Sequence, residues 1–277
     1  MNDVETSAKS ELAVGIGGFG AIGREIAARL DRGAPGLRLS AVSARDLAKA
    51  EANMAAFETK VPVLKLSELA DHADIVVECA PAAVFREVAE PALRKGRTFL
   101  PLSVGALLLH DDLVGIAEGS GGRIVVPTGA LLGLDAVRAA AEGEIESVTM
   151  VTRKPPGGLA GAPHLEKHGI DVSALTAPLK VFDGSAREGA KGFPANVNVA
   201  AALSLAGIGP DRTRLEIWAD PGVTRNTHHI TVEADSARFE MTIENVPSGV
   251  NARTGKITAL SALSALKGLT STLKVGS

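Results

Sequence analysis

Residues 12–23, LAVGIGGFGAIG, decide the fold class of this chain. The apolar residues at the start of the stretch are typical of a short buried strand, and a helical pattern follows over residues 24–33. Between them, Gly18, Gly20 and Gly23 form a G-x-G-x-x-G motif. A strand, a glycine-rich turn and a helix in this order predict a dinucleotide-binding unit. A purely structural glycine turn is the competing interpretation, and the flanking strand and helix disfavour it.

Each glycine of the motif has its own physical reason. Gly18 permits a tight turn, Gly20 lacks a Cβ and lets a pyrophosphate approach the backbone, and Gly23 lets the helix pack close to the strand. The free N–H groups at the start of the helix then face the phosphates. We therefore expect cofactor contacts along the whole turn, at Gly18, Phe19, Gly20, Ala21, Ile22 and Gly23.

The end of the predicted second strand, residues 37–44, bears on the choice between NAD and NADP. An acid that binds the ribose 2′-hydroxyl of NAD is expected ~20 residues past the last glycine. Ser43 occupies this position, and Arg45 follows it. Ser43 and Arg45 together can accept the 2′-phosphate of NADP, unless Arg45 is only a solvated loop charge. Asp46 can instead rotate in, so either NAD or NADP fits the sequence.

Strand and helix patterns alternate through the first half of the chain. Strands are predicted at 73–81, 98–107 and 123–133, with helices at 83–96 and 110–122 between them. This alternation predicts a parallel, doubly wound sheet, whose ligands lie outside the carboxyl ends of the strands. The residues at these ends are Cys79, Ala80, Ser103, Val104, Gly105, Gly129 and Ala130, of which Cys79, Ala80, Ser103 and Ala130 are expected to contact the cofactor.

From about residue 146 the pattern changes to strands with few helices between them. Several of these segments alternate between apolar and polar residues, which predicts a mostly antiparallel sheet with one buried face. The strand-like segments are 146–156, 179–188, 213–221, 228–234 and 237–247. One helix is predicted at 194–207, and the apolar residues 257–269 predict another that packs across the domain junction.

The fold class is therefore α/β, with an N-terminal Rossmann domain and a C-terminal α+β domain. We expect a flexible tail over residues 1–11. Residues 12–134, together with a C-terminal helix at about 251–277, are expected to form the Rossmann domain. Residues 135–250 are expected to form the substrate-binding, catalytic and dimerisation domain, and the cleft between the two domains is the default active site.

Composition narrows the class of function. The chain has 277 residues, is 45% hydrophobic and has a net charge of −3, which gives no footprint for nucleic acid or an anionic membrane. Its apolar runs are too short to predict a transmembrane helix. The single cysteine, Cys79, suggests a reducing cytoplasm. Cys79 is either a small buried residue or a nucleophile, and the absence of a basic neighbour in sequence favours the former.

Two pairs of histidines are candidates for chemistry. In the predicted strand 228–234, His228 shares its face with apolar residues, whereas His229 lies on the polar face. His228 is thus either a hydrogen-bonded core residue or a catalytic base, and His229 is a solvated residue. His164 and His168 have a spacing that suits one helical face, but no third ligand is evident, so no metal site is expected.

Several segments, taken together and in this order, resemble the L-aspartate dehydrogenase family over about residues 12–268. These segments are VGIGGFGAIG (14–23), LPLSVGAL (100–107), PTGALLGLDA (127–136), FPANVNVAAALSLAG (193–207), DPGVTRNTHHI (220–230) and ARTGKITALSAL (252–263). The resemblance implies NAD(P)-dependent oxidation of L-aspartate to iminoaspartate, which can hydrolyse to oxaloacetate and ammonia. It also implies that the imine can feed NAD biosynthesis, and we expect a cytoplasmic homodimer.

The resemblance also implies residue roles. The catalytic histidine of the family lies in an Asn-x-His-x-Ile segment, which here makes His228 the catalytic residue. Ala130 and Asn198 are implied as cofactor contacts, with Asn196 as the competing choice for the asparagine. The expected substrate residues are Arg225, Asn226 and Lys154, with Arg225 and Lys154 binding the two carboxylates.

Two other functions fit the same fold. One is a reductase of another amino-acid pathway, similar to dihydrodipicolinate reductase or homoserine dehydrogenase. The other is a non-enzymatic protein that senses NAD(P).

Overall fold

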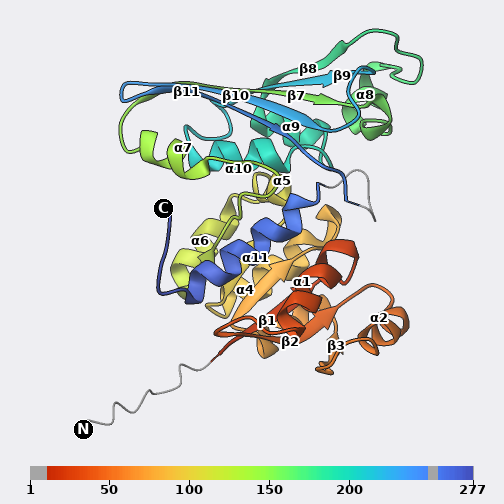
Figure 1. The fold of residues 1–277 in the computed structure, drawn as a ribbon, viewed down its shortest axis with the longest axis vertical. Coiled ribbons are helices and arrows are strands. Elements are labelled where there is room, and N and C mark those ends of the chain that lie inside the picture. The colour runs from red at the N-terminus through yellow and green to blue at the C-terminus, as the bar shows by residue number, and fades with distance from the viewer. Residues whose placement is uncertain (1–10, 249–254, 277) are drawn as a thin grey trace.

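The computed structural model describes residues 11–248 and 255–276. Residues 1–10 of the predicted tail therefore lie outside the described residues. Two β-sheets, each with its own helices, form the two ends of the elongated molecule (Figure 1). No helix among the described residues combines the length and the apolar character needed to span a membrane.

The first sheet is six-stranded and entirely parallel, in the order β3-β2-β1-β4-β5-β6. The order runs outward from β1 in both directions, as expected for a doubly wound sheet. Its strands are β1 (Leu12–Gly17), β2 (Leu37–Ser43), β3 (Val63–Leu64), β4 (Ile75–Glu78), β5 (Thr98–Pro101) and β6 (Arg123–Ile124). The helices between them are α1 (Ala21–Asp31), α2 (Leu47–Met54), α3 (Leu69–His72), α4 (Phe85–Arg94), α5 (Val104–Leu107) and α6 (Asp112–Ser120), with short 3₁₀ turns at Leu66–Glu68 and Ala82–Val84. The predicted Rossmann fold is confirmed.

The turn between β1 and α1 needs glycine at two of its positions. Gly18 has φ +107°, and a Cβ there would lie 2.6 Å from the carbonyl carbon and oxygen of Cys79. In the first turn of α1, a Cβ at Gly23 would overlap the carbonyl oxygen of Gly18. The backbones of β1, α1 and the end of β4 are therefore packed as closely as glycine allows.

The second sheet is mixed, in the order β11-β10-β7-β9-β8. β7 and β9 pair in parallel, whereas the other neighbours are antiparallel, so the prediction of a mostly antiparallel sheet is confirmed. Its strands are β7 (Ile145–Lys154), β8 (Leu179–Ser185), β9 (Arg214–Ala219), β10 (Thr227–Ala234) and β11 (Arg238–Glu244). The accompanying helices are α7 (Leu134–Ala140), α8 (Pro163–His168), α9 (Ala186–Gly192) and α10 (Asn198–Ala206), with a 3₁₀ turn at Pro156–Gly158. Helices α7, α9 and α10 lie on the face that looks toward the first sheet (Figure 1).

Several predicted strands end earlier than expected, and three of them do so for a local reason. The segment 179–188 ends as a strand at Ser185, because Ser185 and Glu188 form a capping box that starts α9. The segment 123–133 pairs as a strand over residues 123–124, and its later glycines, Gly129 and Gly133, adopt positive φ angles. The segment 98–107 turns into α5 after Pro101.

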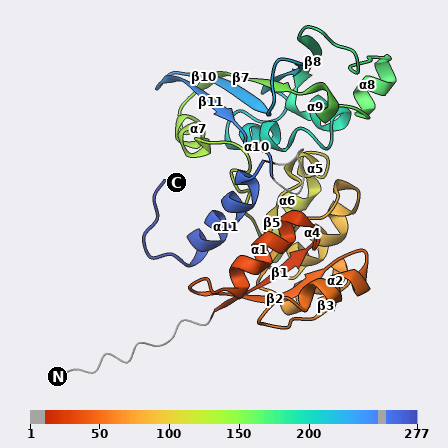
Figure 2. The ribbon, with the colours of Figure 1, turned by 45° about the vertical axis from the view of Figure 1, so that its right-hand side comes forward.

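The helix α11 (Ile257–Thr270) returns the end of the chain to the first sheet. Its buried residues Ala262 and Leu266 belong to the same hydrophobic cluster as Ile26 of α1, and α11 lies beside α1 in both views (Figures 1 and 2). In the opposite direction, Val104 of α5 and Leu108, which follows it, belong to the cluster under the second sheet. Each half of the chain therefore contributes residues to the hydrophobic core of the other half. The expected division into domains stays a prediction.

Candidate active site between the two sheets

A cavity of about 190 Å³ lies between the two sheets and brings most of the expected site residues together. The first half of the chain contributes residues that follow β1, β4, β5 and β6, and the second half contributes residues of β7, β10, α10 and the segment before it. The lining residues that the sequence indicated are Ile22, Cys79, Ala80, Ser103, Ala130, Lys154, Asn196, Asn198, Asn226 and His228. The cavity therefore joins the two sets of residues that the sequence assigned to cofactor and substrate.

The glycine turn fits a dinucleotide. No atom lies within 4 Å of a Cβ built at Gly20, which leaves the space in front of this residue open. Gly20 is the N-cap of α1, and its carbonyl accepts a hydrogen bond from the Arg24 N–H. No side chain among the described residues caps the first N–H groups of the helix, so they can bind an anion. Gly18, Phe19, Ala21 and Gly23 lie in this same turn, outside the lining of the cavity. The turn can thus hold the pyrophosphate while the cavity holds the nicotinamide.

The end of β2 presents the residues considered for the adenosine ribose. Asp46 caps α2, because its side chain accepts a hydrogen bond of 3.0 Å from the Lys49 N–H. The side chain of Ser43 is buried, and its hydroxyl has no hydrogen-bond partner among the residues that the structure describes. Arg45 is exposed. Asp46 therefore serves the helix, and Arg45 is left as the charged group at this edge.

Glu78 was not indicated by the sequence analysis. It ends β4 and is fully buried, and it accepts hydrogen bonds from the Leu102 N–H, the Ser103 N–H and the Ser103 hydroxyl at 2.9–3.2 Å. Burial raises the pKa of Glu78 to about 7, although the bonds from Ser103 act in the opposite direction. Its carboxyl group links the ends of β4 and β5, next to Cys79 and Ala80. An acid that ends an otherwise apolar strand, as in IVVE, was the available signal.

Cys79 lies in the cavity wall beside Glu78. Burial, and then the negative charge of Glu78, raise the pKa of the Cys79 thiol well above its ordinary value. Cys79 is partly buried, and a thiol held in this protonated state is a poor nucleophile.

His228 is 2% exposed, whereas the side chain of His229 is 43% exposed. The predicted alternation of the strand is therefore confirmed. The Nδ1 atom of His228 lies 3.1 Å from the hydroxyl of Thr152, which is its register partner on β7. Burial, and then the charge of Lys154, lower the pKa of His228 to about 3. The imidazole is thus neutral at physiological pH and is oriented by Thr152.

Lys154 ends β7 and is 5% exposed. Its Nζ donates to the backbone carbonyl of Asn196 at 3.2 Å and to the Asn196 side-chain oxygen at 2.9 Å. No carboxylate among the described residues lies within ion-pair distance of this ammonium group, and burial lowers its pKa to about 8. A buried cation bound only to neutral acceptors is a strong site for an incoming carboxylate.

The competing asparagines have different partners. Asn196 holds Lys154, whereas the side-chain oxygen of Asn198 accepts a hydrogen bond of 3.0 Å from the Gly105 N–H. Asn198 therefore connects α10 to α5 of the first half, and its amide nitrogen stays available as a donor. This arrangement favours Asn198 as the cofactor contact and gives Asn196 the task of positioning Lys154.

The structure does not bring Arg225 into the cavity. Its side chain is 45% exposed and lies 3.9 Å from Glu244. Arg225 and Asn226 precede β10, and only Asn226 of the two lines the cavity. Asn245 lines it as well and was missed, because nothing in the segment ENVP separates this asparagine from a turn residue.

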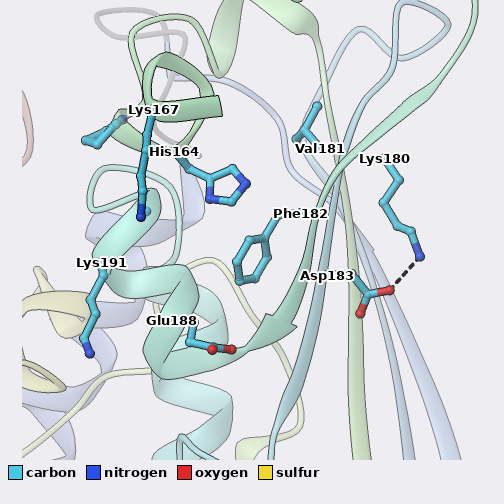
Figure 3. A pocket seen from close by; sticks show the side chains of 10 residues that line it. His164, Lys167, Lys180, Val181, Phe182, Asp183, Glu188 and Lys191 are labelled. Atoms are coloured by element: carbon cyan, nitrogen blue, oxygen red, sulfur yellow. Dashed lines mark hydrogen bonds and ion pairs between the residues drawn. The ribbon is translucent and has the colours of Figure 1, made fainter. Parts of the chain in front are cut away.

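The histidine pair that was weighed as a metal site lies elsewhere. The ring of His164 packs against Phe182 and Phe193, with centroid distances of 5.3 and 5.2 Å. His164, Lys167 and Lys191 line the same surface pocket at α8 and α9 (Figure 3). Among the described residues, no group of three or more His, Cys, Asp or Glu side chains could hold a metal ion. His164 is thus an aromatic packing residue.

A parallel dinucleotide-binding sheet, joined through a polar cavity to a mixed sheet that carries a buried histidine and lysine, defines an oxidoreductase. Residues 18–127 match the NAD-binding domain of homoserine dehydrogenase, and residues 135–269 match the C-terminal domain of aspartate dehydrogenase. The chain is 57% identical to L-aspartate dehydrogenase of Bradyrhizobium diazoefficiens, covering 98% of this chain and 96% of the relative. It is 56% identical to L-aspartate dehydrogenase 3 of Bordetella bronchiseptica, covering 98% and 99%. The chain belongs to the L-aspartate dehydrogenase family.

A solved structure shares this fold. The crystal structure of aspartate dehydrogenase from Thermotoga maritima is 22% identical in sequence and has a TM-score of 0.71, covering 96% of this chain and all of that chain. The structure of a homoserine dehydrogenase from Thiobacillus denitrificans is similar at a TM-score of 0.61 and 15% identity, covering 94% of this chain and 73% of that one.

The two adjacent histidines give a matched pair of variants. His228→Ala should lower kcat by roughly 10²-fold or more, the usual scale for a positioned acid–base group, with little change in cofactor affinity. His229→Ala should behave like the wild type because its side chain lies on the outer face. Steady-state kinetics and cofactor titration measure both. A larger loss in His229→Ala would contradict the assignment.

Proposed function

We propose that this protein oxidises L-aspartate to iminoaspartate with a nicotinamide dinucleotide. The observation that carries the proposal is the pairing, within one cavity, of neutral His228 and cationic Lys154 with Ala80, Ser103 and the other residues at the strand ends of the dinucleotide-binding sheet. The bound cofactor supplies the hydride acceptor for the Cα hydrogen of the substrate.

The proton chemistry falls to His228. Aspartate enters with an ammonium group, which must lose one proton before its nitrogen can form the C=N bond. His228 is neutral. In the tautomer whose Nδ1–H donates to the Thr152 hydroxyl oxygen, Nε2 carries the lone pair that accepts this proton. A bound dicarboxylate raises the pKa of His228, because it offsets the charge of Lys154. Substrate binding therefore strengthens the base that the substrate needs.

Recognition of the substrate carboxylates falls to Lys154 and to neutral amides. The Lys154 ammonium group is buried and bound to Asn196, so it can form a charge-assisted bond with a carboxylate without changing place. Asn226 lies beside it in the cavity and can donate from its amide nitrogen. Arg225 then acts on a carboxylate only if the segment before β10 moves.

The preference among amino acids tests this recognition. The kcat/KM for aspartate should exceed that for asparagine and alanine by roughly 100-fold or more, because a buried cation left without its carboxylate is costly. Glutamate should also be poor, since its extra methylene displaces one carboxylate. The measurement is initial-rate kinetics on the four amino acids with saturating cofactor. Equal rates with asparagine or alanine would exclude recognition of two carboxylates.

The second part of the proposal concerns the cofactor. The match to an NAD-binding domain supports a nicotinamide dinucleotide, and we propose that NADP binds at least as well as NAD. Support comes from Ser43, which brings no carboxylate to the 2′-position, and from Asp46, whose side chain caps α2. The exposed Arg45 can then offer its charge to a 2′-phosphate.

Removal of this charge separates the two cofactors. Arg45→Ala should weaken NADP binding about tenfold or more and leave NAD binding within about twofold, because the 2′-phosphate is the sole difference between the ligands. Arg38→Ala, which removes an exposed charge on β2, the strand that precedes Arg45, is the control. Fluorescence titration of NADH and NADPH gives both affinities. An equal loss for the two cofactors would make Arg45 a loop charge without a role in selection.

We further propose a cytoplasmic homodimer whose product can feed NAD biosynthesis. The expectation of a reducing cytoplasm rests on the single cysteine, and the biosynthetic link rests on the family. The dimer is supported by the face of the second sheet opposite α7, α9 and α10. On this face, Val151 of the central strand β7 pairs with His229 of β10 on one side and with Glu216 of β9 on the other, and it is half-buried. A second copy of the chain can cover this face.

Sedimentation velocity tests the dimer. The wild type should sediment at twice the 28.3 kDa mass of one chain, and Val151→Glu should shift it toward the monomer because it places a charge at the centre of the contact. Val114→Glu, a change on the exposed side of α6, should have no effect. A monomeric wild type would exclude the dimer.

A further inference from the structure

Asn245 occupies a defined place beside the catalytic histidine. In the register of β10 and β11, His228 lies opposite Ile243, and Thr227 lies opposite Glu244. One step further the backbone N–H of Asn245 bonds the Asn226 carbonyl at 2.9 Å. Because side chains alternate along a strand, Asn245 shares the inner face with His228. The two are diagonal neighbours, a spacing of about 7–8 Å between Cα atoms.

The same register forms a row of polar residues across three strands. Thr227 of β10 lies opposite Arg153 of β7 as well as Glu244 of β11. One residue further along each strand come Lys154, Asn226 and Asn245, and all three line the cavity. This second row runs from the cation Lys154 to the amide of Asn245. His228 is the next residue of β10 on the same face after Asn226.

The orientation of the Asn245 amide follows from its partners. Its Nδ2 donates to the Ala130 carbonyl at 3.2 Å, so its Oδ1 is the free end. Asn245 is 5% exposed, and Oδ1 is buried without a hydrogen-bond partner among the residues that the structure describes. A Cβ at Gly255 would lie 3.0 Å from Oδ1, so only glycine lets the backbone pass this close to the oxygen.

A buried acceptor without a donor lowers the stability of the free protein, and a ligand that supplies the donor removes this cost in the complex. Aspartate has two carboxylates, which only accept hydrogen bonds, and one ammonium group, which only donates. We propose that Asn245 is a substrate-orienting residue whose Oδ1 accepts a hydrogen bond from the α-amino group of aspartate. This inference rests on the proposed oxidation of aspartate.

The proposed contact completes the geometry of the reaction. The amine then lies between Asn245 and His228, and one N–H bonds Oδ1 while another faces the imidazole that accepts its proton. Lys154, at the other end of the row, takes a carboxylate. The bond from Asn245 to Ala130 ties this arrangement to the loop that follows β6 on the cofactor side. Asn245 therefore fixes the nitrogen of the substrate relative to both His228 and the cofactor.

Two variants separate the oxygen of Asn245 from its nitrogen. Asn245→Leu removes both the acceptor and the donor at similar volume. Asn245→Asp keeps an acceptor and loses the donor to Ala130. Thr242→Ala, an exposed position on the outer face of the same strand, is the control. The probes are aspartate for turnover, succinate as a dicarboxylate without an amine, and NADH and NADPH for cofactor affinity.

We expect Asn245→Leu to lower kcat/KM for aspartate about 10- to 100-fold, the scale of a hydrogen bond to a charged group. The affinities for succinate, NADH and NADPH should stay within about twofold of the wild type. Asn245→Asp should retain clearly more turnover than Asn245→Leu, because it keeps the acceptor. Thr242→Ala should match the wild type in every assay.

Three results would overturn the inference. A parallel loss of succinate affinity in Asn245→Leu would mean that the side chain only supports the cavity. A loss of NADH and NADPH affinity would assign Oδ1 to the carboxamide of the nicotinamide. Equal turnover in Asn245→Asp and Asn245→Leu would assign the effect to the bond with Ala130. Failure of the wild type to oxidise aspartate is a separate result, because it removes the proposed function itself.

Discussion

The register of three strands, β7, β10 and β11, is the constraint on which the rest of the site depends. It places Thr152 beside His228 and carries Lys154, Asn226 and Asn245 to the edge of the sheet that faces the cofactor residues. A slip of one residue in β10 would turn His228 outward and bring His229 into the cavity. The buried residues Ile230 and Val232, which share the face of His228, oppose such a slip because it would expose them to water.

Burial then determines the charges in the site. Lys154 and His228 are both removed from water and lie close enough for the lysine charge to act on the imidazole. Two basic groups in such a place disfavour a second proton, so the lysine keeps a charge while the histidine stays neutral. The cavity thus holds one group suited to an anion and one group suited to accept a proton. Glu78, on the cofactor side, shows the same effect in the opposite direction, because its burial favours the protonated carboxyl group.

The connections between the two halves hold the site together. Asn198 reaches the Gly105 N–H, Asn245 reaches the Ala130 carbonyl, and Arg187 of α9 donates to the Leu108 carbonyl. Each of these bonds joins a residue of the second half to a segment that follows a strand of the first sheet. Helix α11 adds a further connection, since it returns to pack on α1. The cavity therefore depends on bonds between residues that are distant in the sequence.

The sequence by itself determined the elements whose reasons are local. The glycine turn requires Gly18 and Gly23 because no Cβ fits there, and the alternation of residues 228–234 separates His228 from His229. Only the tertiary structure decided which side chains meet. Arg225, next to Asn226 in the sequence, lies outside the cavity, whereas Asn245 and Glu78 gain their places from strand pairing and burial. The physical reason is that alternation along a strand is a local property, whereas register and loss of solvent arise from contacts between distant segments.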